Sequence, residues 1–248
     1  MADANGMAPS ISAISLDGPS VRLRPMTRAD YGFMWQCRTH PEILYLWMQD
    51  RTLPSFEQYT HELEGSLASK ALTTLLIETV DGSAPVGYVF AYDFSAFDHT
   101  AFISIVIHPT YVRYGWAAEA SILFLNYLFT YFDLRKASME VFAFNQLALA
   151  PLLQLGARIE GRFRGQRYYQ GAYHDVIRLA VMHEEWDQVA PRLLAALMRD
   201  DGHMDEANPF TPLPLEAESE PPQDASANNG SHHRKRRPRH AVGSQTTR

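Results

Sequence analysis

The segment from residue 105 to residue 120 carries the side chains best suited to bind a ligand. An apolar strand runs into a short loop, and a helix opens at Gly115 with Ala117 and Ala118 close behind. Unpaired backbone N–H groups and the positive end of the helix dipole would face outward together there. Because Gly and Ala leave the backbone open, a phosphate can approach it closely, and Arg113 can add a charge-assisted contact. The pattern indicates a pyrophosphate site, with plain helix packing as the alternative.

The residue types give little support for disulfide, metal or redox chemistry. The chain has one cysteine, Cys37, so it can form no internal disulfide and no multi-cysteine metal site, and a lone cysteine is typically a small buried hydrophobe. His232, His233 and His240 lie close together, but in a segment whose composition predicts no fixed structure to orient them. The phosphate loop also lacks the G-x-G-x-x-G pattern of dinucleotide-binding folds. We expect no metal and no redox cofactor.

The elements that position the loop follow from hydrophobic periodicity and turn residues. Strands are expected at residues 21–26, 72–80, 86–94, 99–107, 137–142, 158–168 and 173–182. Helices are expected from Thr27 to about Thr39, from Ser55 towards Lys70, from about Gly115 to Phe132, from Asn145 to Gly156 and at residues 184–198. This order predicts an α/β fold of the α+β kind, a mixed sheet with helices packed on its faces.

The loop before Gly115 resembles the pyrophosphate loop of the GNAT superfamily of N-acyltransferases. The pattern of that family is Gln or Arg, two residues, Gly, one residue, then Gly or Ala. Gly115 and Ala117 match it, whereas Val112 stands at the Gln/Arg position and Arg113 comes one place later.

Two further stretches are similar to one GNAT branch, the Rim-type enzymes that acetylate ribosomal-protein N-termini, which also takes in enzymes for many small amines. Residues 21–27, Val-Arg-Leu-Arg-Pro-Met-Thr, followed by Asp30, resemble its opening. The spacing of that branch is also matched downstream by Asn145, Leu152, Leu155-Gly156, Glu160-Gly161, Gly171, Tyr173 and Asp175. The resemblance covers about residues 21–187.

The resemblance implies a GNAT fold whose fourth and fifth strands splay apart and admit the pantetheine arm of acetyl-CoA. The implied cofactor contacts are the backbones of Ile105, Val106 and Ile107 for pantetheine, the run Arg113, Tyr114, Gly115, Trp116, Ala117 and Ala118 for pyrophosphate, and Asn145 for pantetheine. A helix N-cap is the alternative role for Asn145. Pro151 predicts that the helix after Asn145 is kinked or starts late.

The implied reaction is transfer of an acetyl group from acetyl-CoA to a primary amine by direct attack. The branch often has a glutamate base on the fourth strand and a serine on the next helix, but Phe102 and Ala148 stand at those positions. The base is therefore expected elsewhere. The candidates are His99, which we favour because an imidazole titrates near neutral pH, and Tyr173 with Asp175, beside Asp98 and His108. A turn or hairpin role is the alternative for each.

The acceptor is expected to be a small-molecule amine, because aromatic residues cluster where the family builds its acceptor site. These residues are Trp35, Tyr45, Trp47, Phe56, Tyr168, Tyr169 and Tyr173. Two alternative functions that also involve acyl-CoA stay open. One is a protein N-terminal acetyltransferase, and the other is an acyl-CoA-binding protein without turnover. A third is a nucleic-acid-binding protein that works through its basic tail, although a solvated tail is the simpler interpretation.

The chain divides into a leader at residues 1–20, a domain at 21–199 and a tail at 200–248. Residues 200–224 hold eight acidic residues and no Lys or Arg, whereas residues 234–248 hold six basic residues and no acid. Both the leader and the tail have compositions that predict disorder. No segment reaches the length that a bilayer requires, and we expect a cytoplasmic monomer or homodimer with no membrane partner.

Overall fold

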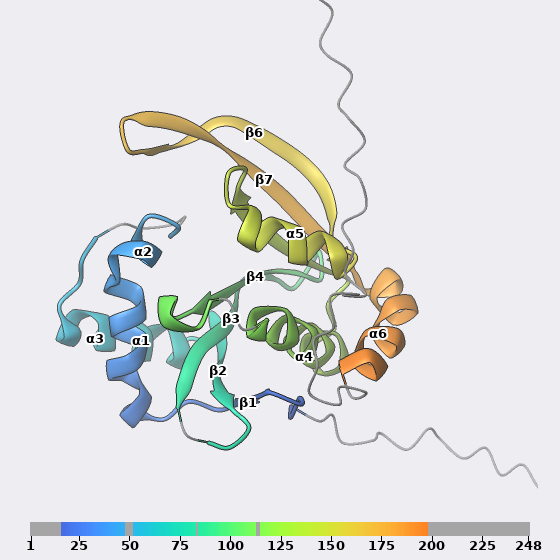
Figure 1. Ribbon diagram of the computed structural model, residues 1–248, viewed down its shortest axis with the longest axis horizontal. Coiled ribbons are helices and arrows are strands. Elements are labelled where there is room, and N and C mark those ends of the chain that lie inside the picture. Colours follow the sequence, from blue (N-terminus) through green and yellow to red (C-terminus); the bar gives the residue numbers. More distant parts are fainter. Residues whose placement is uncertain (1–15, 48–51, 83, 113–114, 198–248) are drawn as a thin grey trace, which may run out of the picture. The chain divides into compact units, whose positions relative to one another are not determined.

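A seven-stranded sheet organises the part of the chain that the structure describes (Figure 1). The computed structural model describes residues 16–47, 52–82, 84–112 and 115–197. In spatial order the strands are β1 (Val21–Arg24), β2 (Leu72–Thr79), β3 (Pro85–Ser95), β4 (Thr100–Ile107), β5 (Lys136–Phe142), β7 (Ala172–Met182) and β6 (Arg158–Tyr169). All neighbours are antiparallel except β4 and β5, which run parallel. The predicted mixed sheet is confirmed.

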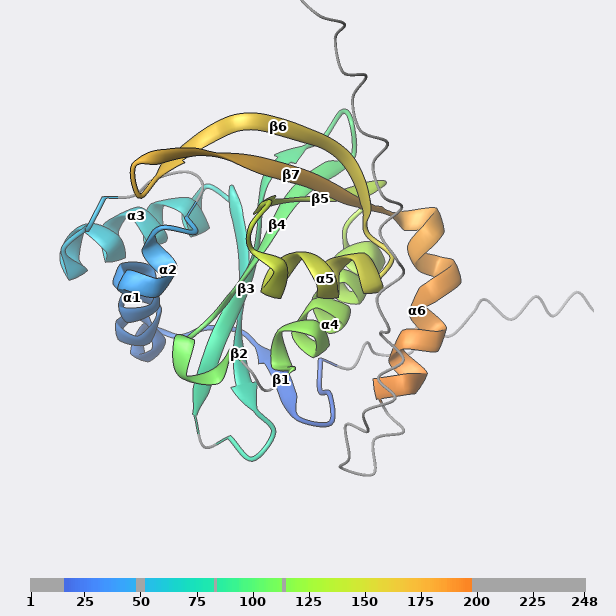
Figure 2. The same ribbon diagram turned by 45° about the horizontal axis from the view of Figure 1, so that its top comes forward.

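Helices cover both faces of this sheet (Figure 2). One face carries α1 (Tyr31–Thr39), α2 (Pro41–Leu44) and α3 (Phe56–Ala68), and the other carries α4 (Trp116–Tyr131), α5 (Gln146–Gln154) and α6 (His183–Leu197). Short 3-10 turns at Arg28–Asp30 and Pro109–Tyr111 lead into the elements that follow them. No helix in the described ranges has the length and apolar character needed to cross a membrane.

Local signals in the sequence set several of the boundaries. Ser55 caps α3, because its Oγ accepts from the Gln58 N–H at 3.2 Å while the Gln58 side chain accepts from the Ser55 N–H at 3.0 Å. Gly156 follows α5 with φ of +91°, a conformation that glycine adopts without strain. Gln170 and Gly171, with φ of 47° and 82°, turn the β6–β7 hairpin. These three predicted boundaries are confirmed.

Two buried clusters lie on opposite faces of the sheet. The larger packs α4, α5 and α6 against β-strand side chains such as Ile77, Val89 and Ile103. The smaller gathers Tyr31, Met34, Cys37, Ile43, Leu63, Leu76, Tyr88, Phe90 and Val106 beneath α1, α2 and α3. Burial raises the pKa of the Cys37 thiol to about 12, so it is held protonated as a small hydrophobe. The expectation that Cys37 is buried and not a nucleophile is consistent with this position.

Two local features differ from expectation. The four-residue helix α2 was not predicted, because its apolar residues are too few to show a period. Helix α5 begins directly after Asn145 and continues through Pro151, so a late start is wrong. Proline lacks the N–H that would bond to the carbonyl of Leu147, and α5 therefore tolerates one missing hydrogen bond. The predicted tail, and the predicted leader up to residue 15, lie outside the described residues.

The sheet opens at its centre. Strands β4 and β5 are paired over only three residues on each side, Thr100–Phe102 with Lys136–Ser138, and no register continues beyond Phe102. Strand β4 keeps its other neighbour, since it pairs with β3 up to Ile107. The second half of β4 therefore has one bonded edge and one edge that faces a gap between the strands.

Candidate active site

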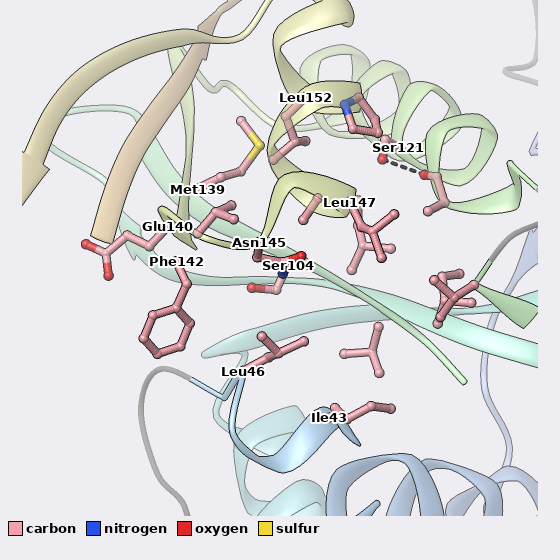
Figure 3. A pocket seen from close by; sticks show the side chains of 18 of the residues that line it. Ile43, Leu46, Ser104, Ser121, Met139, Glu140, Phe142, Asn145, Leu147 and Leu152 are labelled. Carbon is pink, nitrogen blue, oxygen red and sulfur yellow. Dashed lines mark hydrogen bonds between the residues drawn. The ribbon is translucent and has the colours of Figure 1, made fainter. Parts of the chain in front are cut away.

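A pocket of about 550 Å³ fills the region where β4 and β5 diverge (Figure 3). Its lining comes from β3, β4, β5, α4, α5, and from α2 with the residues that follow it. Figure 3 shows Ile43 and Leu46 of the α2 region on one side of the strands, and Leu152 and Ser121 on the other. The pocket therefore has access to both faces of the sheet.

Side-chain alternation along the strands divides the pocket into two halves. The α4–α5 half is lined by Ile103, Ile105, Ile107, Met139, Val141, Ala117, Ala118, Ser121, Asn145, Leu147, Ala148, Pro151 and Leu152. The α2 half is lined by Ser104, Val106, Glu140, Phe142, Phe90, Tyr92, Glu42, Ile43, Tyr45, Leu46 and Trp47. The two halves meet between the strands, so a ligand that enters from one face can touch a ligand bound at the other.

The open edge of β4 presents backbone groups to this meeting point. The His108 N–H donates to the Val86 carbonyl at 2.9 Å, and the β3–β4 register continues without a shift from Ile107 back to Phe102. Backbone groups alternate in direction along a strand, so those of Val106 point towards β3 and those of Ile105 and Ile107 point into the gap. Of the three predicted backbone contacts, Ile105 and Ile107 are oriented for a ligand, whereas Val106 offers only its side chain.

The start of α4 supplies a second set of donors. Gly115 is the N-cap, with φ of +74°, and its carbonyl accepts from the N–H groups of Ala118 and Glu119. The N–H groups of Trp116 and Ala117 come before the first intrahelical donors, and the side chains of Ala117 and Ala118 line the pocket. The start of α4 therefore presents small side chains and the first backbone N–H groups of the helix to the α4–α5 half. Arg113 and Tyr114 lie outside the described residues.

The acidic residue in the first turn of α4 is turned away from this position. Glu119 is buried, and its Oε1 accepts from the N–H groups of Ser20 and Val21, each at 2.9 Å. The carboxylate therefore ties the start of β1 to α4. Its charge is compensated by backbone donors and does not compete for an anion at the helix start.

Asn145 lies at the N-cap position of α5, but its side chain makes no capping hydrogen bond. Its carbonyl accepts from the N–H groups of Ala148 and Leu149, so the backbone alone starts the helix. The amide side chain lines the pocket. The side chain of Asn145 therefore does not act as an N-cap, and its contact with the cofactor stays a prediction.

The α2 half holds an ion pair in a mainly aromatic setting. The Arg178 Nε donates to the Oε1 of Glu140 at 3.1 Å, and Nη2 of Arg178 donates to the same oxygen. The Arg178 guanidinium carbon lies 5.2 Å from the ring centre of Phe102 and 4.9 Å from that of Phe163. Glu140 lines the pocket and is mostly buried. Burial also raises the pKa of Tyr92, which keeps its hydroxyl protonated at neutral pH.

Aromatic rings form much of the wall and roof of the α2 half. Trp47 stacks on Phe90 with ring centres 5.7 Å apart, and Phe90 lies 5.6 Å from Tyr92. Tyr45 stacks on Tyr169 of the hairpin at 4.5 Å. Of the aromatics expected to line an acceptor site, Tyr45 and Trp47 line the pocket. Trp35, Phe56, Tyr168, Tyr169 and Tyr173 are not among the described lining residues.

None of the five candidate bases, His99, Tyr173, Asp175, Asp98 and His108, is among the described lining residues of the pocket. His99 precedes β4 at the end where β4 and β5 are still paired, and its Nδ1 lies 2.9 Å from the carbonyl oxygen of Asp133. Asp175 accepts from the Gly165 N–H and from Arg162 Nε, each at 2.7 Å, and these two contacts lower its pKa. Tyr173 is 73% exposed. The fold does not bring His99, Tyr173 or Asp175 together with the loop before α4.

Sequence reasoning missed the polar residues of the α2 half, Glu42, Tyr92, Ser104 and Glu140. One signal was available, because Glu140 is an acid inside the apolar run of β5 and Arg178 is a base inside the apolar run of β7. A charged pair on two buried strands marks a polar site within a core. In the described residues no three His, Cys, Asp or Glu side chains are grouped so that they could hold a metal ion.

Comparisons with known proteins agree with this geometry. Residues 20–158 match the family model described as an acetyltransferase (GNAT) domain. The spermidine N(1)-acetyltransferase of Escherichia coli strain K12 is 24% identical over 167 residues, which are 67% of this chain and 88% of that protein, and the protein of E. coli O157:H7 gives the same figures.

Among solved structures, spermidine N-acetyltransferase from Vibrio cholerae, in complex with CoA and spermine, superimposes with a TM-score of 0.63. Its sequence identity is 22%, and the match covers 67% of this chain and 97% of that one. This likeness shows the fold. Together with the family model, which spans more than half of the chain, it identifies the protein as a member of the GNAT acetyltransferase family.

Proposed function

We propose that this acetyltransferase moves an acetyl group from acetyl-CoA to a primary amine of a small molecule, in a complex that holds both substrates at once. The observation that carries the proposal is the pocket that joins the two faces of the sheet between β4 and β5. A thioester in the α4–α5 half and an amine in the α2 half would meet in the gap. Such positioning is itself a large part of the catalysis of group transfer.

The donor side uses the residues around α4 and α5. The backbone N–H of Ala117 in the first turn of α4, with Gly115 and Ala118 leaving room, would bind the pyrophosphate at the positive end of the helix. The backbone edge at Ile105 and Ile107 would hydrogen-bond the amides of pantetheine as a strand would. The side chain of Asn145 would add a polar contact to the same arm.

In the reaction, the lone pair of the neutral amine attacks the thioester carbonyl carbon, and the carbonyl oxygen takes up negative charge. An N–H on the open edge of β4 would stabilise that oxygen. The C–S bond then breaks, CoA leaves as a thiolate, and the amine proton passes to it or to water. Glu140 is the more buried of the two carboxylates that line the described pocket, and its position supports a role as contact for the incoming ammonium.

A small amine is favoured over the N-terminus of a protein by the stack of Tyr45 on Tyr169, which links the α2 region to the hairpin beside the α2 half. A peptide chain would need a continuous groove at that position, and the described residues bring two rings together there instead.

Purified protein should release free thiol from acetyl-CoA only when a primary amine is present, and mass spectrometry should find the acetylated amine. Initial-rate lines with both substrates varied should intersect, because no acyl-enzyme forms. Parallel lines would contradict direct attack. Binding of acetyl-CoA without release of thiol for any amine would support the acyl-CoA-binding alternative instead.

A further inference from the structure

The α2 half of the pocket has an apolar, ring-lined surface. Five aromatic side chains line it, Tyr45, Trp47, Phe90, Tyr92 and Phe142, together with Ile43 and Leu46. Neighbouring rings are in contact, as the Trp47–Phe90 and Phe90–Tyr92 distances show. A ligand that binds in this half loses its water contacts and packs against aromatic rings. An apolar ligand body therefore binds favourably, and each additional charge on the ligand weakens binding.

Acidic side chains are scarce on the same surface. Glu42 and Glu140 are the two carboxylates among the described lining residues. Nε and Nη2 of Arg178 both donate to Oε1 of Glu140, so the charges of the pair largely cancel. The guanidinium is held between the rings of Phe102 and Phe163, which keeps the positive charge beside Glu140.

We propose that the acceptor is a monoamine whose single nitrogen is attached to an aromatic or aliphatic body, and not a polyamine. This inference rests on the proposed function and names the substrate class of the same site. It differs from the substrate in the names of the matched relatives, spermidine and spermine, which carry several amino groups.

The preference for a monoamine follows from the positive charge that remains on the acceptor once its attacking nitrogen is neutral. A monoamine then places no cation in the pocket, and its body packs against the rings. A polyamine still carries one or more ammonium groups, each of which must leave water and find a partner. The aromatic faces can offer cation–π contacts, but the one Glu140 oxygen that Arg178 does not bond can hold only one ammonium group, and the guanidinium repels a second cation nearby.

Arg178 is therefore inferred to be the positioning residue that sets this preference. It orients Glu140 through the Oε1 contacts and leaves Oε2 for one ammonium group. It also cancels the excess negative charge that would favour a polycation. Both effects follow from the position of the Arg178 guanidinium, which packs against the rings of Phe102 and Phe163 beside Glu140.

The test compares kcat/KM of the full chain, with saturating acetyl-CoA, for 2-phenylethylamine and 1-hexylamine against putrescine and spermidine. We expect both monoamines to exceed both polyamines by at least tenfold. Equal or higher values for spermidine would overturn the substrate class and leave the proposed acetyltransferase function intact. If calorimetry shows that 2-phenylethylamine binds the CoA complex but no amine is acetylated, the proposed function fails while the substrate class is supported.

A variant pair tests the role of Arg178. In Arg178→Met, Glu140 is no longer neutralised, and the ratio of kcat/KM for spermidine to that for 2-phenylethylamine should rise at least tenfold. Arg162→Met is the matched control, because Arg162 pairs with Asp175 on the same hairpin and does not line the pocket; its ratio should equal that of the wild type. An unchanged ratio in folded Arg178→Met would overturn the assignment. The comparison of the four amines with wild-type protein tests the substrate class even if Arg178→Met fails to fold.

Discussion

The ring of Tyr45 stacks on the ring of Tyr169, with centres 4.5 Å apart and planes inclined by 18°. Tyr45 follows α2 and lines the pocket, whereas Tyr169 ends β6, more than a hundred residues later in the chain. Phe144 continues the cluster, at 6.1 Å from Tyr169 and 4.9 Å from Phe142. The contact connects the hairpin to the α2 region at the acceptor side of the pocket.

This contact predicts the effect of removing the Tyr169 ring. An aromatic pair contributes about 0.5–1.5 kcal/mol beyond burial, so Tyr169→Ala should raise KM for the amine by roughly 2–10-fold through a less ordered Tyr45. Acetyl-CoA affinity, measured by calorimetry, should stay the same. Tyr168→Ala is the control, because Tyr168 is half exposed and pairs with Tyr173 instead. Equal effects of the two substitutions would show that the Tyr45 contact has no role in binding.

A second prediction concerns the proposed phosphate site at the start of α4. Ala117→Asp places a carboxylate in the first helical turn, where it favours the helix dipole but repels a pyrophosphate. Acetyl-CoA should bind at least tenfold more weakly in titration calorimetry, with an unchanged or higher melting temperature. Ala117→Asn has the same size without the charge and should lose less affinity. Gly115 is a poorer position for this test, because its φ of +74° strains any side chain.

A third prediction separates the two accounts of the proton. Because the His99 imidazole contacts Asp133 and does not line the pocket, His99→Ala should keep the wild-type kcat and pH–rate profile. Glu140→Gln should raise KM for the amine by on the order of tenfold, since a charge-assisted contact is lost. A fall in kcat for His99→Ala on the order of a hundredfold would restore the histidine as general base.

A fourth prediction addresses stability. Asp30 accepts from both outer nitrogens of Arg24, each at 2.9 Å, and from the Thr27 N–H at 2.7 Å. The Arg24 hydrogen bonds are the main cause that lowers the pKa of Asp30 from 3.8 to about 2. The stabilisation is fully present above pH 3.8 and is lost as the pH falls towards 2, because the unfolded chain takes up the proton first.

Asp30→Asn should therefore lower the free energy of unfolding at pH 7 by about 2 kcal/mol. Urea denaturation of both proteins between pH 7 and pH 3 measures the difference, which should shrink below about pH 4. A difference that is independent of pH would mean that shape, and not charge, explains the effect. Glu64→Gln is a suitable control, because its contact with Arg28 is solvent-exposed.

A fifth prediction comes from composition alone and concerns residues 200–248, which we propose to be dispensable. The segment has too few apolar residues to offset the entropy of ordering it. A chain that ends at residue 199 should keep its melting temperature and its kcat on a small amine. A drop in either quantity would show that the tail contributes to the domain.

The sequence by itself determined most of the elements and was enough to propose a donor side for the site. Periodicity and capping residues such as Ser55 and Gly156 act within a few residues of where they stand, so the strands and most helices could be read from the chain. The loop before α4 is also local, because the end of a strand, a glycine and two alanines all lie between residues 105 and 118. Helix α2 was missed because four residues hold too little periodic information.

Only the tertiary structure decided the acceptor side. The α2 half brings Tyr45, Phe90 and Glu140 together from three elements that are distant in the chain, and Arg178 and Tyr169 reach it from the hairpin. The parting of β4 from β5 after Phe102 determines which backbone groups are free, and it depends on strand pairing that no single segment encodes. Residues such as His99 and Asp175 had the right chemistry, but the fold satisfied them with contacts outside the pocket.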